Sequence, residues 1–247
     1  MADNSRISWT NATWNPLAGC TKVSPGCEHC YAERMSRRLM AMGRSGYKDV
    51  INLKTGKWNN RVELLTGALS IPLHWKKPRM IFVNSMSDLF HKNVPDWYIA
   101  SVMEVMMKAN WHTFQVLTKR PERMLEVLGG HNLPGHIWLG VTMEDEARAI
   151  ERTRIFRRVG PAVRFVSVEP MLEPFLVPAI EKWDWVIVGG ESGPGARAFQ
   201  WDWARSIRDQ CREYDIPFFM KQGGGHPNSQ KKLEDLPEDL RIREMPR

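Results

Sequence analysis

The sequence lacks the features that mark several whole classes of protein. No apolar run approaches the roughly 18 residues of a membrane-spanning helix, and the first six residues do not show the charged-then-apolar pattern of a signal peptide. We therefore expect neither membrane insertion nor export, and predict a cytoplasmic protein. A hydrophobic content of 43% excludes a disordered or collagen-like chain. Only four cysteines are present, and a reducing compartment disfavours disulfides, so their spacing is interpreted in terms of metal binding.

Acidic residues are fewer than basic ones. There are 35 Lys and Arg against 28 Asp and Glu, a net charge of +7, which favours contact with a polyanion. Nucleic acid or a nucleotide is therefore the expected substrate or partner, with Trp14, Trp58 and Trp75 as candidates for stacking on bases. Five arginines crowd one predicted helix, which indicates either a solvated basic face or a nucleic-acid surface. These are Arg148, Arg152, Arg154, Arg157 and Arg158.

Short apolar runs alternate with helix-like segments along the chain. The runs cover residues 81–83, 114–117, 137–141, 163–168, 185–188 and 217–220, with residues 7–10 as a weaker candidate for an additional first strand. Nearly unbroken apolar runs are typical of strands covered on both faces of a parallel sheet. Helices are predicted over residues 30–42, 96–108, 121–129, 144–159 and 202–214. This alternation predicts an α/β fold, and about seven strands favour a complete or partial (β/α) barrel over a doubly wound sheet.

The organisation along the chain is predicted to be simple. We expect one barrel-like domain over residues 1–222, which carries a cysteine loop at 19–31. An irregular insertion, rich in glycine, proline and tryptophan, follows the helix after that loop at 43–78. Residues 223–247 are expected to form a polar C-terminal tail or flap.

Polar or small residues follow each predicted strand. The carboxyl ends of parallel strands lie on one rim of a sheet, where ligands bind. The candidates on this rim are Asn84, Ser85, Asp88, Lys119, Thr142, Ser167, Glu169, Gly189, Gly190, Glu191 and Lys221.

Three thiols, Cys20, Cys27 and Cys30, lie within the cysteine loop, and the turn at residues 24–26 can fold the first toward the other two. This spacing predicts one metal site. Zinc would require a fourth ligand from His29 or from Cys211, although Cys211 lies on an apolar helix stripe and is better suited to packing. Three thiolates alone suit an iron–sulfur cluster with one open iron.

Here the chain resembles a known group of enzymes. A cysteine triplet after the first strand of a (β/α) barrel, running into a helix, is similar to the radical S-adenosylmethionine (radical SAM) superfamily. The whole chain also resembles a phage- and mobile-element-borne family of three-cysteine-motif proteins, the phage Gp37/Gp68 type. The matching segments are TWNP (13–16), the cysteine segment (19–32), SMSDLF (85–90), LTKRP (117–121), VSVEP (166–170), VGGESG (188–193) and FFMKQ (218–222).

The resemblance implies a radical SAM enzyme with a [4Fe–4S] cluster on Cys20, Cys27 and Cys30. It further implies SAM as cofactor, a reductant such as flavodoxin or ferredoxin, and nucleic-acid modification, repair or phage defence as the role. A separate partner protein that recognises the target is also compatible with it. The substrate-side residues are then expected to be catalytic, and the remaining rim residues to bind the cofactor. The catalytic candidates are Glu169, Glu191 and Lys221; the cofactor-binding candidates are Asn84, Ser85, Asp88, Lys119, Thr142, Ser167, Gly189 and Gly190.

Two features depart from the superfamily pattern. Six residues separate Cys20 from Cys27 where three are usual, and His29 stands where an aromatic residue is common. The Gly-Gly-Glu sequence at 189–191 follows a late strand instead of the second one. Two alternatives therefore stay open: a zinc-stabilised nucleic-acid-binding or accessory protein without catalysis, and a metal-independent enzyme that uses Glu169, Glu191 and Lys221 as acid–base groups.

Overall fold

The structure is a computed structural model that describes residue 5, residues 7–225 and residues 229–246. Its longest strands and helices alternate along the chain, which confirms the predicted α/β class. The strands of the main sheet are β1 (Ala12–Trp14), β4 (Met80–Val83), β5 (Thr113–Thr118), β6 (Ile137–Thr142), β7 (Val163–Val168), β8 (Trp185–Gly189) and β9 (Phe218–Gln222).

The main sheet has seven strands in the order β1-β4-β5-β6-β7-β8-β9. The pairs β1–β4, β4–β5, β7–β8 and β8–β9 are parallel. The order across the sheet follows the order along the chain, without the reversal that defines a doubly wound sheet. This topology is compatible with a partial (β/α) barrel.

The prediction for the first strand was wrong. Residues 7–10 form a bend and turn, and β1 begins at Ala12, where Thr13 is in register with Phe82 of β4. The Thr10 hydroxyl donates to the carbonyl of Met80 at 2.9 Å, which ties this turn to the start of β4. A three-residue strand carries almost no propensity signal, because its pairing depends on the neighbouring strand.

The described residues fall into two compact units. The first unit comprises Met1–Val23, Cys30–Leu139 and Val159–Ala162; the second comprises Ser24–His29, Gly140–Arg158 and Val163–Arg247. The cysteine loop thus contributes residues to both units. No helix in the described part of the chain is long and apolar enough to cross a membrane.

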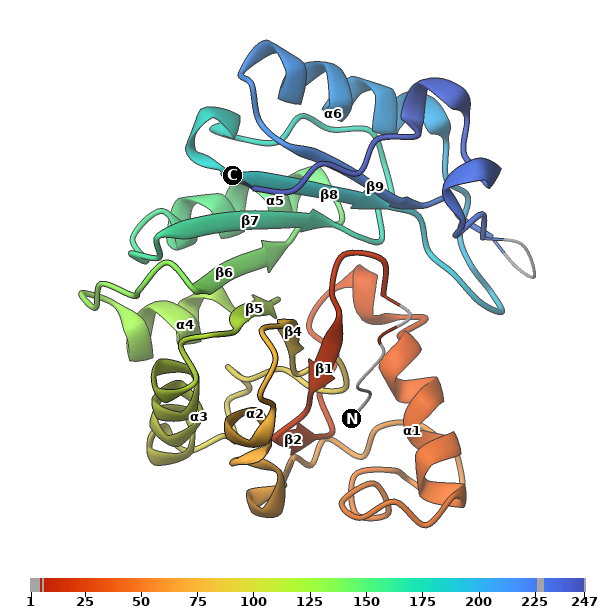
Figure 1. The fold of residues 1–247 in the computed structure, drawn as a ribbon. Coiled ribbons are helices and arrows are strands. Elements are labelled where there is room, and N and C mark those ends of the chain that lie inside the picture. Colours follow the sequence, from red (N-terminus) through yellow and green to blue (C-terminus); the bar gives the residue numbers. More distant parts are fainter. Residues whose placement is uncertain (1–4, 6, 226–228, 247) are drawn as a thin grey trace. The chain divides into compact units, whose positions relative to one another are not determined.

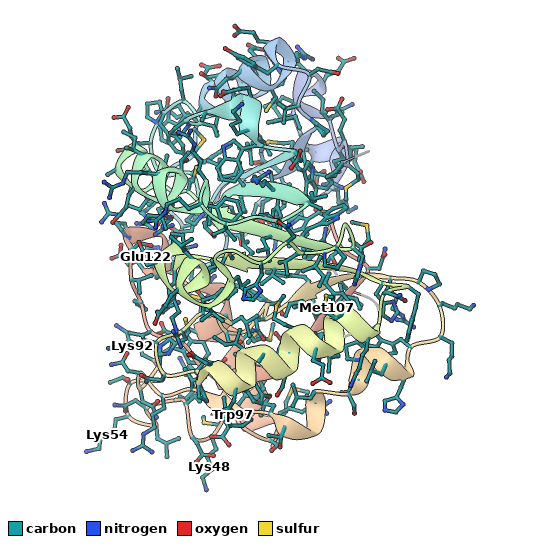
Figure 2. All side chains as sticks on the ribbon, turned by 90° about the vertical axis from the view of Figure 1, so that its left-hand side faces the viewer. Lys48, Lys54, Lys92, Trp97, Met107 and Glu122 are labelled. Atoms are coloured by element: carbon teal, nitrogen blue, oxygen red, sulfur yellow. The ribbon has the colours of Figure 1, made fainter. Side chains whose placement is uncertain are left out.

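The first unit holds β1, β4 and β5 with the helices that follow them. Its helices are α1 (Tyr31–Ala41), α2 (Ile71–His74), α3 (Asp96–Lys108) and α4 (Pro121–Leu128), and β2 (Leu17–Ala18) pairs antiparallel with β3 (Glu63–Leu64). Proline at the first position of α4 fits the predicted helix start. Helix α3 buries its inner face and exposes Trp97 and Met107, which Figure 2 shows on the yellow helix.

The segment predicted as an irregular insertion packs against α1. Val50, Ile51 and Trp58 form a small core with Met35 and Leu39, which lie four residues apart on one stripe of α1. Tyr31 and Met42, at the two ends of the same stripe, are instead 54% and 60% exposed, because the stripe runs past the insertion core at both ends.

Two of the tryptophans proposed to stack on bases are core residues. Trp14 is fully buried and Trp58 is 8% exposed, so neither presents a ring face to a base. The Trp14 ring nitrogen donates to the carbonyl of Ala68, which fixes the indole inside the first unit. At these two positions the tryptophans contribute to the core, and the prediction that they stack on bases is wrong.

The second unit holds β7, β8 and β9 with α5 (Glu146–Phe156) and α6 (Trp201–Glu213). The Asp145 side chain caps α5 by accepting from the backbone of Arg148. Helix α6 lies against β8 and β9, as seen in blue in Figure 1, and buries Ile207 and Cys211 completely.

The C-terminal segment is not a free polar tail where it is described. Backbone hydrogen bonds join Met220 to Ile242 and Phe218 to Glu244, so the segment lies along β9. Two short 3-10 helices, η4 (Leu233–Asp235) and η5 (Glu238–Leu240), precede this contact, and Leu240 is fully buried.

Candidate functional site

Parallel strands place their carboxyl ends on one rim within each unit. In the first unit the rim carries Asn84, Ser85 and Asp88 after β4, and Lys119 and Arg120 after β5. In the second unit it carries Ser167 and Glu169 at β7, residues 189–191 at β8, and Lys221 on β9. The predicted residues therefore gather as two sets, one per unit.

Asp88 is the centre of the first set. One carboxylate oxygen accepts from the Thr118 hydroxyl at 2.7 Å and the backbone of Phe90 at 3.0 Å. The other accepts from Arg120 at 2.6 Å and from the backbone of Lys119 at 3.3 Å. Because all of these contacts come from the protein, Asp88 positions the rim and Arg120, with little capacity left to bind a cofactor directly.

Arg120 brings this charge network to the first cysteine. Its guanidinium lies 3.7 Å from the Cys20 sulfur through both terminal nitrogens, and it donates to the carbonyl of Thr21 at 2.7 Å. Burial raises the pKa of the Cys20 thiol to about 12, against the lowering effect of Arg120, and charge on Cys30 adds to the rise. In this environment Cys20 holds its proton unless a bound cation displaces it.

His91 supports the backbone beside Cys20. It is fully buried, and burial together with the Arg120 charge lowers its pKa to about 4, so the ring is neutral. The backbone of Asn93 donates to Nδ1, which assigns the proton to Nε2. Nε2 therefore donates to the Thr21 hydroxyl at 2.8 Å and fixes the residue that follows Cys20.

Asn84 is the least satisfied polar residue of the first set. It is 3% exposed, and neither its side-chain oxygen nor its side-chain nitrogen has a partner among the described residues. Its φ of 60° lies in the left-handed region, which asparagine tolerates better than most residues. A buried amide without partners is costly, so this position suits a polar ligand group.

Neighbouring residues fix the segment that directly follows Asn84. The side-chain oxygen of Asn15, just after β1, accepts from the Ser85 hydroxyl at 3.2 Å and from the backbone of Met86 at 3.0 Å. A parallel bridge between Gly19 and Ser87 then brings the start of the cysteine loop to the end of β4. This geometry explains why Cys20 lies on the rim.

Glu169 and Lys221 pair across the second set. Both carboxylate oxygens of Glu169 accept from the Lys221 ammonium, at 2.6 and 2.7 Å, and each side chain is about one-fifth exposed. The Gln222 amide donates to the carbonyl of Gly190 at 3.0 Å. These are two of the three groups that sequence reasoning assigned to catalysis, and in the structure they neutralise each other.

Glu191 holds part of the cysteine loop. It accepts from Arg197 at 2.7 Å and from Nδ1 of His29 at 2.9 Å, and Arg197 also donates to the carbonyl of Pro25 at 2.9 Å. Burial opposes ionisation, but the hydrogen bonds from Arg197 and His29 outweigh it and lower the Glu191 pKa to about 2. The carboxylate is thus ionised at neutral pH and anchors residues 25–29.

Four further candidates lie at buried positions of the second set. Thr142 and Ser167 are 2% and 1% exposed, and their carbonyls accept from Arg152 and from the backbone of Met143. A Cβ at Gly190 would come within 2.6 Å of the Gly224 backbone, whereas at Gly189 it would meet Glu169 and Gln222 at an ordinary 3.5 Å. Gly190 is therefore explained by packing, and Gly189 is the one with room beside it.

The thiols of the cysteine loop form no disulfide among the described residues. Cys20, Cys27 and Cys30 are partly buried and unbridged, and the 3-10 helix η1 (Pro25–Cys27) places Cys27 3.7 Å from the Ser24 hydroxyl. Within the described ranges, no three His, Cys, Asp or Glu side chains are already gathered as a metal site. The donor set itself, three thiols in eleven residues, has the chemistry that an iron–sulfur cluster requires, and Asn84 in the first unit adds an unsatisfied amide.

Sequence reasoning missed His91 and Arg197, and it considered His29 only as a zinc ligand. His91 and Arg120 flank Cys20, while His29 and Arg197 meet at Glu191. The LTKRP and VGGESG segments contain Arg120 and Glu191. His29 lies 162 residues from Glu191 in the sequence, so no local pattern could indicate that the two side chains pair.

Comparison with known proteins gives one match. Residues 4–242 match the model of a family described as "Protein of unknown function (DUF5131)". No curated protein and no solved structure matches the chain.

Proposed function

Since the chain belongs to the DUF5131 family, whose description assigns no reaction, we propose from the site itself that it is a radical SAM enzyme acting on nucleic acid or a nucleotide. The observation that supports this most is the placement of Cys20. It follows the first strand of a sheet whose parallel strands run in chain order, and Arg120 and the Gly19–Ser87 bridge place it at the rim of β4 and β5.

The proposal gives each residue of the first set a task. Cys20, Cys27 and Cys30 would bind a [4Fe–4S] cluster through their thiolates, which leaves one iron for SAM. Such a cluster, when bound and reduced, supplies the electron that cleaves a carbon–sulfur bond of SAM, whose adenosyl group then takes a hydrogen atom from the substrate. Asn84 would offer its amide to the polar groups of SAM, and Ser85 would orient the loop that carries it.

Arg120 and Lys119 provide positive charge at the same rim. The guanidinium beside Cys20 favours the thiolate form that binds a metal, and Asp88 holds that guanidinium in place. Lys119 is partly buried at the end of β5 and would balance the carboxylate of SAM. In the second unit, Glu169 and Lys221 remain candidates for contact with the substrate.

A second candidate is a zinc-stabilised protein without catalysis, and one observation favours it. Zinc-bound histidines usually donate their second ring nitrogen to a carboxylate, and His29 already meets Glu191 through Nδ1. Nε2 of His29 would then complete a site with the three cysteines. The two candidates predict different metals on the same loop.

Anaerobic expression followed by iron, sulfide and zinc analysis distinguishes them. We expect about four iron and four sulfide per chain, with an EPR signal of the reduced protein that changes on addition of SAM. Alanine at Cys20, Cys27 or Cys30 should abolish the iron, while Cys211→Ala, which removes the buried thiol of α6, should keep it. Circular dichroism of each variant reports on the fold separately. One zinc and no iron after anaerobic reconstitution would contradict the radical proposal and support the second candidate.

A further inference from the structure

A cavity in the second unit lies at the opposite ends of its strands from the residues discussed above. Its volume is about 250 Å³, and it is lined by Phe156, Arg157, Arg164, Lys182 and Trp183. Arg164 is the second residue of β7, Arg157 follows the last residue of α5, and Lys182 ends the 3-10 helix η3 (Ile180–Lys182) before β8. The cavity therefore belongs to the amino ends of β7 and β8.

The floor of this cavity is apolar and fixed. The rings of Phe156 and Trp183 stack at 5.3 Å with an angle of 4° between their planes, and they are 0% and 3% exposed. The Trp183 ring nitrogen donates to the carbonyl of Pro178 at 3.1 Å. Since the rings are buried and their polar atom is used, the floor offers shape and a low dielectric, but no face for a base to stack on.

The cations around this floor lack carboxylate partners. Among the described residues, the side chains of Arg157, Arg164 and Lys182 form no ion pair and no hydrogen bond. The neighbouring acid, Asp184, accepts from the backbone nitrogen of Arg164 at 2.7 Å instead. Several other cations of this unit do pair with a carboxylate. These are Arg148, Arg152, Arg197, Arg205, Arg208 and Lys221.

We propose that this cavity is a phosphate-binding subsite that holds a backbone phosphate of a nucleic acid. Arg157 and Lys182 are exposed and Arg164 is partly buried, so an anion can reach all three cations, and arginine pairs well with phosphate oxygens. The volume of about 250 Å³ is below the ~300–1,000 Å³ of sites that enclose a whole small ligand, so it suits a phosphate group better than a complete nucleotide.

The surrounding surface favours a polymer over a free anion. Arg154 and Arg158 are exposed on the same end of α5 and extend the positive charge beyond the cavity. Strand β7 is six residues long, so its two ends are roughly 20 Å apart at about 3.3 Å per residue. The subsite would thus contact the nucleic acid away from the strand ends that carry Glu169. It extends the proposed function to a nucleic-acid contact, and does not require the cluster.

The test measures binding of the full chain to fluorescein-labelled single-stranded DNA, double-stranded DNA and RNA over a range of salt concentrations. The test variant carries Arg157→Gln, Arg164→Gln and Lys182→Gln. The matched control carries Lys48→Gln, Lys54→Gln and Lys92→Gln, which remove three exposed charges from the first unit (Figure 2).

We expect the test variant to bind at least one of these nucleic acids about tenfold more weakly or worse, with the slope of log K against log salt reduced by about 0.7 to 0.9, as for the loss of one phosphate contact. The control should change the slope by less than about 0.5. Equal losses in both variants, or no loss in the test variant, would overturn the proposal. Inorganic phosphate and unlabelled oligonucleotide should also be compared as competitors at equal phosphate concentration. If both displace the labelled nucleic acid equally well, the ligand is a small anion and the proposal is overturned.

Two further measurements keep the test decisive. Circular dichroism and thermal unfolding check the fold of the triple variant, and if it unfolds, Lys182→Gln alone should still weaken binding more than Lys54→Gln does. Iron content and the SAM-dependent EPR signal should be the same in the test variant and the unmodified protein. A binding defect in the test variant supports the subsite, whatever reaction the cluster performs. Absence of the cluster from the unmodified protein contradicts the proposed function but leaves the subsite standing if that binding defect is still seen.

Discussion

The buried ion pair between Glu144 and Arg152 makes the sharpest test of the energetics of the second unit. The two side chains are 0% and 5% exposed, and they meet through two contacts, at 2.7 and 3.2 Å. Arg152 also donates to the carbonyl of Thr142 at 2.7 Å, at the end of β6. Glu144→Gln keeps the volume of the side chain but removes its charge, which leaves the guanidinium of Arg152 buried without a counter-ion.

Removing one partner of such a pair costs about 3–5 kcal/mol of unfolding free energy, because the remaining charge is desolvated. For a chain of this size each kcal/mol lowers the melting temperature by about 2–4 °C, so the expected decrease is about 6–20 °C. Lys108→Gln is the control. It breaks a pair with Glu104 whose side chains are 61% and 62% exposed, and it should cost less than about 0.5 kcal/mol.

Urea unfolding followed by far-ultraviolet circular dichroism and by tryptophan fluorescence measures both variants, and coincident transitions show that one free energy describes the unfolding. The double variant Glu144→Leu with Arg152→Met, measured together with Glu144→Leu and Arg152→Met as single variants, provides a double-mutant cycle. Because both charges are then replaced by apolar groups, it should be much more stable than the sum of the single variants predicts. A loss below about 1 kcal/mol for Glu144→Gln, or additive losses in the cycle, would show that water reaches this pair and that the reasoning from burial is wrong.

Three further predictions concern the rim. Because the Glu191 pKa falls from 4.5 unfolded to about 2 folded, its contribution is complete above pH 4.5 and is lost as the pH falls toward 2; Glu191→Gln should flatten the stability curve in that range, and an unchanged curve would contradict the assignment. Gly190→Ala should cost about 1–3 kcal/mol, because its Cβ would clash with the Gly224 backbone, whereas Gly189→Ala should unfold like the unmodified protein in urea. Asn84→Gly should leave the ligand-free protein at least as stable in urea while abolishing the SAM-dependent EPR change, since it removes an unsatisfied amide and relieves a positive φ; a loss above about 1 kcal/mol would mean that the amide has a partner.

The sequence predicted the strands well where burial alone determines them. The runs at 163–168 and 185–188 became β7 and β8 almost unchanged, because residues covered on both faces must be apolar along their whole length. The first strand failed for the opposite reason. Its three residues gain their conformation from pairing with β4, and no local pattern records that pairing.

The arginine cluster shows what the sequence could not separate. Five arginines within eleven residues predicted one basic face, but the fold gives them different roles. Arg152 is buried against Glu144, Arg148 pairs with Asp145, and Arg157 lines the cavity. Helical spacing places Arg152 on the inner side of α5, while its partner precedes the helix, so the pair becomes visible only once the turn before α5 is formed.

The same pairing bears on how the candidate site can work. Each predicted carboxylate of the rim is bound to a cation: Asp88 to Arg120, Glu169 to Lys221, and Glu191 to Arg197. A general acid must hold its proton near neutral pH, and Glu191, with a pKa of about 2, does not. A metal-independent acid–base enzyme that uses Glu191 is therefore disfavoured by this geometry. The three cysteines form no disulfide and the Asn84 amide has no partner among the described residues, so the metal analysis should begin with them.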